Sequence, residues 1–272
     1  MITQTHFQVC ISWRHLLFTC KKLVLKNANN LKANVRIIDN TGALCMLKKL
    51  KSANFQKVRV ANAISVGGMI GAGKTTLSGA LGKALNANVV YELSENDELQ
   101  DALLKRLYKG DEVSAAAFQI YFFCMRFNKY KENIKNSNLS IFDRTIFEDR
   151  LFAHQNMTAD PIMFGYYDAM WHEKTKELVY SVGVPKLYII LDLKWKEFKD
   201  KIFKRGRACE IDNFSENESY FKSLQSVYVK YLRKTCQIYG INHIVVDSEI
   251  PTDKQVKKII EKIKDEKLIE GV

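Results

Sequence analysis

"VGGMIGAGKTTLSGALGKAL", residues 66–85, joins a glycine-rich turn to the start of a regular helix. Within it, Gly68–Thr75 fits the pattern G-x-x-x-x-G-K-[ST]. The apolar run Val60–Val66 precedes the glycines and reads as a buried strand, while leucines recur every four residues over Leu77–Leu85, as on one face of a helix. The pattern therefore lies between a strand and a helix, which is the context that a phosphate-binding loop requires.

The residue types of this loop suit a polyphosphate ligand. Positions without a side chain let backbone N–H groups point inward, and the following helix adds its positive N-terminus. Lys74 would reach the β- and γ-phosphates, and the Thr75 hydroxyl would bind Mg²⁺. The alternative is a glycine-rich turn without a ligand, and the flanking strand and helix argue against it. The candidate nucleotide-binding residues are Gly68, Met69, Ile70, Gly71, Ala72, Gly73, Lys74, Thr75 and Thr76.

The rest of the chain alternates between short apolar runs and amphipathic stretches. The further predicted strands cover residues 87–92, 139–143, 186–193 and 241–247. The further predicted helices cover residues 97–108, 113–135, 145–155, 161–182, 194–205, 216–239 and 253–267. Because strands that are apolar throughout alternate with helices, we expect an α/β fold with a five-stranded parallel sheet covered on both faces.

Three of the predicted strands end in residues that could bind a ligand or take part in catalysis. In an open parallel sheet, ligands bind beyond the carboxyl ends of the strands. The loop Gly67–Lys74 and the acids Glu92 and Asp143 all follow such ends. The sequence therefore predicts one site at this edge of the sheet.

Two further stretches contain candidate catalytic residues. In "IFDRTIFEDRLFA", residues 141–153, Asp143 suits a magnesium carboxylate and Arg144 could bridge the transferred phosphoryl group and its acceptor. In "FKRGRACE", residues 203–210, Arg205 and Arg207 flank a glycine after a basic helix. Guanidinium groups on such a segment would stabilise charge on the γ-phosphate oxygens. Taken alone, the acid could be an ordinary strand end and the arginines a solvated helix end.

Together these motifs resemble the deoxynucleoside kinase family over about residues 60–250. The likeness lies in the P-loop, in "YE" at 91–92, "LYKG" at 107–110, "FQIYFFCMR" at 118–126, "DRTIFEDRLFA" at 143–153 and the R-x-R of "KRGRACE" at 204–210. It implies a P-loop kinase fold with an arginine-bearing lid. It also implies transfer of the γ-phosphoryl group of ATP, with Mg²⁺, to the 5′-hydroxyl of a deoxynucleoside in nucleotide salvage.

The resemblance also implies a role for each matching residue. Glu92 would be the general base, Arg144 would orient Glu92 and the acceptor oxygen, and Asp143 would support Mg²⁺. Residues implied to bind the nucleoside are Tyr108 and Glu210 at the sugar 3′-hydroxyl and Gln119 at the base edge, with Phe118 or Phe147 beside it. Lys74, Arg205 and Arg207 would act on the phosphates, the two arginines as the lid.

The pair Arg126 and Asp149 implies a base preference. Family members with this pair tend to prefer deoxyadenosine, deoxyguanosine or deoxycytidine, so we expect a purine deoxynucleoside or deoxycytidine. The alternative is an ordinary buried ion pair. The chain departs from the family in having Leu93 after the proposed base and a competing acid, Glu95, close by.

The charge is concentrated at the N-terminus. The chain has 272 residues and a net charge of +12, and residues 1–60 contain eleven Lys and Arg but one acid, Asp39. We expect residues 1–57 to form a basic, poorly ordered extension and residues 58–272 to form the kinase domain. The scattered cysteines favour a reduced, cytoplasmic protein, and we expect no membrane span, no nucleic-acid partner and, from the resemblance, a homodimer.

Two other functions remain open at this stage. A nucleoside monophosphate kinase of the thymidylate kinase type would share the P-loop, the Asp-Arg step and the arginine lid, but would need further cations for its acceptor. A non-catalytic protein that binds nucleotides or nucleic acid through the basic extension would show a steep salt dependence. The set of Glu92, Arg144 and the two lid arginines argues against the second.

Overall fold

The computed structural model describes residues 58–92, 98–108, 112–134 and 138–269. The predicted basic extension, residues 1–57, lies outside these ranges, as does Glu95. Among the described residues, every helix is too short or too polar to cross a bilayer.

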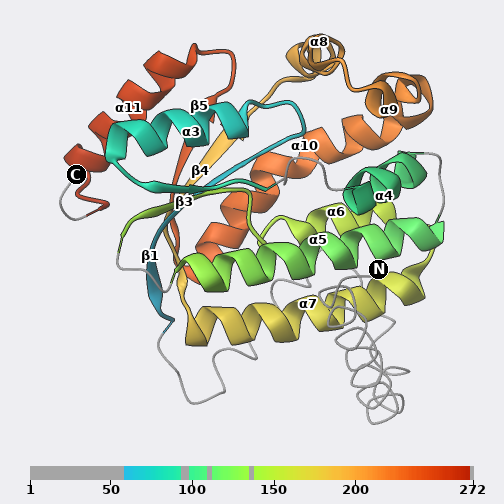
Figure 1. Cartoon of the computed structure of the whole chain (residues 1–272), viewed down its shortest axis with the longest axis horizontal. Helices are drawn as coiled ribbons and strands as arrows, with labels where there is room; N and C mark the ends of the chain where they lie inside the picture. The colour runs from blue at the N-terminus through green and yellow to red at the C-terminus, as the bar shows by residue number, and fades with distance from the viewer. Residues whose placement is uncertain (1–57, 93–97, 109–111, 135–137, 270–272) are drawn as a thin grey trace, which may run out of the picture. The chain divides into compact units, whose positions relative to one another are not determined.

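A five-stranded sheet forms the centre of the described domain (Figure 1). The strand order is β2-β3-β1-β4-β5, and all neighbouring strands are parallel. The strands are β1 (Val60–Gly68), β2 (Asn88–Val90), β3 (Ser140–Asp143), β4 (Val184–Asp192) and β5 (Asn242–Asp247). The central strands β1, β3 and β4 are buried on both faces almost throughout, which explains their continuous apolar runs.

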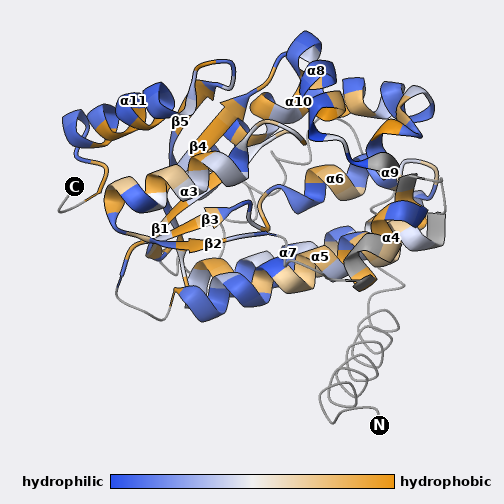
Figure 2. Cartoon of the chain, turned by 45° about the horizontal axis from the view of Figure 1, so that its top comes forward, coloured by the Kyte–Doolittle hydropathy of each residue, from blue (hydrophilic) through white to orange (hydrophobic). Residues whose placement is uncertain are grey.

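Helices cover both faces of this sheet. The helices are α3 (Lys74–Leu85), α4 (Glu98–Tyr108), α5 (Glu112–Asn133), α6 (Asp149–Asn156), α7 (Pro161–Ser181), α8 (Trp195–Arg205), α9 (Ala208–Ile211), α10 (Phe214–Tyr239) and α11 (Thr252–Asp265). Helices α3 and α11 pack together on one face, whereas α5, α7 and α10 belong to the other (Figure 1). On α11 the apolar side chains Ile259 and Ile263 are buried while lysines face outward, and Figure 2 shows the resulting division of the helix into two faces.

The register of the strands places two sequence motifs side by side. Val66 of β1 pairs with Asp143 of β3, so the loop that follows β1 starts beside the acid that ends β3. The chain crosses from β1 toward β2 in one direction and from β3 toward β4 in the other. The two strands therefore flank the point where the connections diverge, which is where parallel sheets bind ligands.

The predicted fold class is confirmed, but one helix begins later than predicted and one short helix was not predicted. The helix predicted over residues 145–155 begins only at Asp149, because residues 144–148 form a turn in which Arg144 has a left-handed backbone (φ 71°). A short helix, α9, follows the two lid arginines and was not predicted. Four residues are too few for a helical repeat to be visible in the sequence.

Candidate active site

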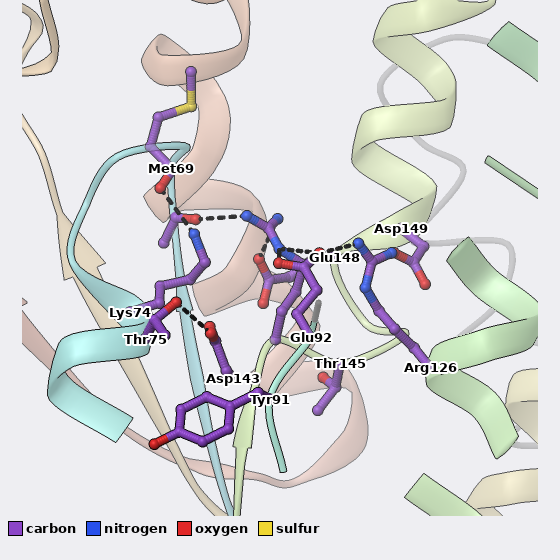
Figure 3. Close-up of polar contacts among 12 residues, drawn as sticks. Met69, Lys74, Thr75, Tyr91, Glu92, Arg126, Asp143, Thr145, Glu148 and Asp149 are labelled. Carbon is purple, nitrogen blue, oxygen red and sulfur yellow. Dashed lines mark hydrogen bonds and ion pairs between the residues drawn. The ribbon is translucent and has the colours of Figure 1, made fainter. Parts of the chain in front are cut away.

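The glycine-rich loop joins β1 to α3 with two left-handed glycines. Gly71 has φ +76° and Gly73 has φ +91°, a region that side chains rarely adopt. Gly73 is the N-cap of α3, and no side chain caps the helix there. The Lys74 ammonium group donates to the backbone oxygen of Met69 at 3.0 Å, so it folds back over the loop (Figure 3). Burial, together with the charge of Arg144, lowers the pKa of Lys74 to about 8.

Thr75 and Asp143 bring a hydroxyl oxygen and a carboxylate together. The Thr75 hydroxyl donates to Oδ2 of Asp143 at 2.5 Å (Figure 3), and the other carboxylate oxygen of Asp143 is buried without a hydrogen-bond partner. Burial raises the pKa of Asp143, and the ammonium group of Lys74 opposes that effect. Carboxylate and hydroxyl oxygens suit Mg²⁺, which takes few protein ligands when substrate phosphates complete its shell. The described residues contain no cluster of three or more His, Cys, Asp or Glu side chains that could hold a metal by themselves.

Glu92 follows β2 and lies between two arginines. Its carboxylate accepts from Nη2 of Arg126 on α5 (Figure 3). It also accepts from Nε of Arg144 at 3.3 Å. The Lys129 ammonium group donates to the backbone oxygens of Tyr91 and Glu92, both at 2.9 Å. Burial alone would raise the pKa of Glu92, but the charges of Arg126 and Arg144 outweigh it and hold this pKa well below the ordinary glutamate range. The carboxylate is therefore ionised at neutral pH.

Arg126 also binds a second acid. Its Nη1 donates to Asp149, the first residue of α6, and its guanidinium lies 4.9 Å from the ring centre of Phe122. Burial raises the pKa of Asp149 to about 7, although the charge of Arg126 acts against this rise. The predicted pair of Arg126 and Asp149 is thus present, and the sequence did not reveal that the same guanidinium also contacts Glu92.

Gln119 has the properties of a ligand-binding amide. Its side chain is 2% exposed, and its Nε2 has no hydrogen-bond partner among the described residues. It lies on α5 with Phe118 and Phe122, whose ring centres are 4.4 Å apart. An unpaired buried amide carries a free-energy cost that a bound partner would remove. Tyr108 is the last residue of α4, and its side chain lies outside the described part of the structure.

The two lid arginines converge on a buried acid. Arg205 ends α8, and its Nη1 lies 3.5 Å from Oε1 of Glu210. Nη1 of Arg207 lies 3.7 Å from the same oxygen. Glu210, on α9, is 2% exposed, and its second carboxylate oxygen is buried without a hydrogen-bond partner.

A cleft of about 1300 Å³ brings most of these side chains together. Predicted site residues that line it are Ile70, Gly71, Ala72, Gly73, Lys74, Thr75, Thr76, Glu92, Gln119, Arg126, Asp143, Arg144, Arg205, Arg207 and Glu210. Gly68 and Met69 do not line it, and Asp149 lies behind Arg126. Phe147 is fully buried and does not line the cleft either, whereas Phe118 and Phe122 do.

Some residues at this site were not predicted from the sequence. Lys129 lies three residues after Arg126 on α5, and this helical spacing was a signal that could have identified it. Phe152, Tyr220 and the segment Ser248–Thr252 also line the cleft. No local pattern marks them, because they reach it from α6, α10 and the loop after β5.

Comparison with known proteins identifies the family. The family model described as deoxynucleoside kinase matches residues 64–270, which is more than half of the chain. The chain belongs to the deoxynucleoside kinase family. The resemblance predicted from the motifs is thereby confirmed.

Individual relatives are similar to this chain over most of their own length. The chain is 44% identical to the uncharacterized protein MG268 of Mycoplasma genitalium, over 81% of this chain and 97% of the relative. It is 31% identical to the deoxyguanosine kinase of Lactobacillus johnsonii, over 63% of this chain and 76% of the relative. A solved structure of the deoxyadenosine kinase from M. mycoides with bound dCMP and dCDP superposes with a TM-score of 0.62 at 25% identity, covering 75% of this chain and 99% of that one.

Proposed function

We propose that this deoxynucleoside kinase transfers the γ-phosphoryl group of ATP to the 5′-hydroxyl of a purine deoxynucleoside or deoxycytidine, as a step of nucleotide salvage. The observation that carries the proposal is that Lys74 and the ionised Glu92 line the same cleft. A cation beside the phosphate loop and a carboxylate opposite it are what an in-line transfer between phosphate and alcohol requires.

On the donor side, the backbone N–H groups of Gly71–Lys74 would surround the phosphates, and the Lys74 ammonium group would leave the Met69 oxygen to bind them. The Thr75 hydroxyl and the Asp143 carboxylate would hold Mg²⁺. When bound, Mg²⁺ would neutralise charge on the phosphate oxygens and orient them.

On the acceptor side, Glu92 would accept the proton of the 5′-hydroxyl. Its lowered pKa makes it a weak base, which suffices because phosphoryl transfer has a loose transition state that needs little early proton removal. Arg144 would keep the carboxylate turned toward the acceptor through its Nε. As the alcohol oxygen attacks phosphorus, the bond to the leaving oxygen breaks and the proton passes to Glu92.

The nucleoside would bind between the aromatic rings and polar groups of α5. Gln119 can donate and accept, so its amide matches the edge of a base, and Arg126 with Asp149 would extend that contact. Tyr108 and Glu210 would bind the sugar 3′-hydroxyl. The names of the relatives support the base preference, and other structures of the M. mycoides deoxyadenosine kinase contain dCTP or dATP.

The lid would complete the site around the transferred group. Arg205 and Arg207 lie at the junction of α8 and α9, on both sides of Gly206, which has a left-handed backbone (φ +74°). Guanidinium groups that reach the γ-phosphate would stabilise its charge in the transition state. We further propose, on family grounds, a cytoplasmic homodimer in which residues 58–272 form the kinase domain.

One panel of assays tests the proposed reaction. The full chain is incubated with ATP, Mg²⁺ and each of the four deoxynucleosides, or each of their monophosphates, and the products are separated. We expect nucleoside monophosphates from deoxyadenosine, deoxyguanosine or deoxycytidine. Formation of diphosphates from monophosphates alone would support a monophosphate kinase, and no transfer to any acceptor would reject catalysis.

A substitution tests the assigned base. Glu92→Gln should lower kcat about 10²- to 10⁴-fold, the range that a positioned general base contributes, and should leave ATP affinity within about twofold. The matched control is Glu261→Gln, which changes an exposed acid on α11. A Glu92→Gln enzyme with the kcat of the wild type would refute the assignment.

A further inference from the structure

Glu148 is a buried acid that the proposed reaction does not use. Its side chain is fully buried in the turn between β3 and α6. Oε1 accepts from the hydroxyl of Tyr188 at 2.6 Å, and Oε2 accepts from Nη1 of Arg144 at 2.9 Å and from the hydroxyl of Tyr228. The three donors come from β4, the turn and α10, so distant parts of the chain meet at this carboxylate.

All three nitrogens of the Arg144 guanidinium are engaged. Nη1 contacts Glu148 and, at 3.1 Å, the Tyr228 hydroxyl. Nη2 donates to the backbone oxygen of Gly68 at 3.2 Å, and Nε donates to Glu92. Glu148, Tyr228 and the Gly68 oxygen therefore leave one direction for Nε, and that direction is toward Glu92.

The backbone of the turn adds to this constraint. Arg144 adopts a left-handed conformation that is uncommon for a side chain larger than glycine, and its N–H donates to the oxygen of Val66 at 3.0 Å. Gly67, the next residue of β1, leaves room for the acid: a Cβ there would lie 2.8 Å from Oε1 of Glu148 and 2.6 Å from the Tyr188 ring. Strand β1, which leads into the phosphate loop, is thus in direct contact with the cluster formed by Glu148, Arg144, Tyr188 and Tyr228, called the Glu148 cluster below.

Stability alone is a weak reason for such a cluster. Burying a charged pair costs desolvation free energy, and replacing it with apolar side chains of similar volume is often neutral or stabilising. In contrast, several directional hydrogen bonds fix the orientation of the Arg144 guanidinium. The arrangement fits a requirement for orientation better than a requirement for stability.

We propose that Glu148, together with Tyr228, is a positioning residue that holds the Arg144 guanidinium so that its Nε meets Glu92. The inference rests on the proposed function, in which Glu92 accepts the proton of the nucleoside. Loss of this cluster lets Arg144 turn away, and misplacement of a catalytic contact by 1 Å can cost about 10²-fold in rate. Neither Glu148 nor Tyr228 lines the cleft that contains Lys74 and Thr75, so we expect ATP binding to be largely spared.

The first experiment separates kcat from KM in the full chain. Glu148→Gln keeps the size of the side chain but replaces one acceptor oxygen, in a place where every neighbour donates. We expect kcat to fall at least about tenfold while KM for ATP stays within about twofold. Tyr228→Phe, which removes one hydroxyl, should lower kcat in the same direction and by less. The matched control is Tyr130→Phe, which removes a buried hydroxyl bound to Gly183 outside the cluster and should leave kcat unchanged.

A double-mutant cycle distinguishes positioning from a general structural role. In the Arg144→Lys background the lysine cannot form the bonds of the guanidinium fork, so Glu148→Gln or Tyr228→Phe should lower kcat by less than twofold further. Independent effects would multiply instead. Full multiplication of the losses, or a kcat of Glu148→Gln within twofold of the wild type, would overturn the proposal.

Two further outcomes also test the positioning role of Glu148. If Glu148→Gln does not fold by circular dichroism, the cycle with Tyr228→Phe and Arg144→Lys carries the test. A wild-type chain that phosphorylates no deoxynucleoside would refute the proposed function, whereas an active wild type with insensitive variants would refute only the positioning role.

Discussion

Glu92 and Asp149 share one guanidinium, because Arg126 donates to Glu92 through Nη2 and to Asp149 through Nη1. The residue expected to recognise the base therefore also touches the proposed general base. One guanidinium therefore links the base-recognition pair and the proposed general base, which the sequence motifs present separately.

Arg126→Gln should move the acid limb of the pH profile of kcat/KM to higher pH. The charge of Arg126 is a main cause of the lowered pKa of Glu92, so its removal lets that pKa rise, and more alkaline conditions are then needed to keep the carboxylate ionised. The measurement is the midpoint of the acid limb, which is independent of the expected loss in nucleoside affinity. Arg59→Gln, on an exposed side chain, is the control. An unchanged midpoint would show that Arg126 does not set the protonation of Glu92.

The affinity for ATP should weaken as the pH rises above about 8. The pKa of Lys74 is lowered to about 8 by burial and by Arg144, so the ammonium form is populated below that pH and the neutral amine above it. Phosphates favour the charged form, and binding should take up protons near pH 8. Calorimetric titrations in buffers with different ionisation enthalpies measure this uptake. Lys74→Met should bind ATP weakly and with no such uptake; equal proton uptake by both proteins would contradict the assignment to Lys74.

Gly67→Ala and Gly165→Ala should change stability in opposite directions. A Cβ at position 67 would meet the Tyr188 ring and Glu148 at less than 3.0 Å, so we expect a loss of about 1–3 kcal/mol in the free energy of unfolding, as for other overpacked sites. A Cβ at position 165, inside α7, meets nothing within 4 Å, and alanine there should add up to about 1 kcal/mol. Urea unfolding of the two variants checks both signs. A Gly67→Ala protein as stable as the wild type would show that Glu148 and Tyr188 can shift away from the added methyl group at little cost in free energy.

Asp168 should contribute stability that disappears in acid. Burial opposes its ionisation, but hydrogen bonds from His172 and Arg150 prevail and lower the pKa of Asp168 to about 2. Because the folded pKa lies below the unfolded one, the contribution is present above about pH 4 and is lost as the pH falls toward 2. The shift corresponds to at most about 2 kcal/mol. The difference in unfolding free energy between the wild type and Asp168→Asn should therefore shrink between pH 5 and pH 3, and a constant difference would disprove the linkage.

The local sequence patterns predicted the sheet and most of its helices. Strand β1 and helix α3 were visible because burial on both faces requires an unbroken apolar run and a helix face requires a four-residue repeat. The start of α6 could not be predicted, because residues 145–148 favour a helix locally while Arg144 takes a left-handed backbone to reach the oxygens of Val66 and Gly68. Bonds to another strand thus overrode the local preference.

By itself, the sequence predicted a phosphate-binding loop after the first strand, and it determined that Glu92, Asp143 and this loop share one edge of a parallel sheet. These properties depend on residue type and spacing, which are local. Only the tertiary structure decided that Arg126 contacts both Glu92 and Asp149, and that Tyr188 and Tyr228 meet Arg144 at Glu148. Those contacts join residues up to 84 positions apart, and their geometry follows from how β4, α5 and α10 pack, which no short stretch of sequence encodes.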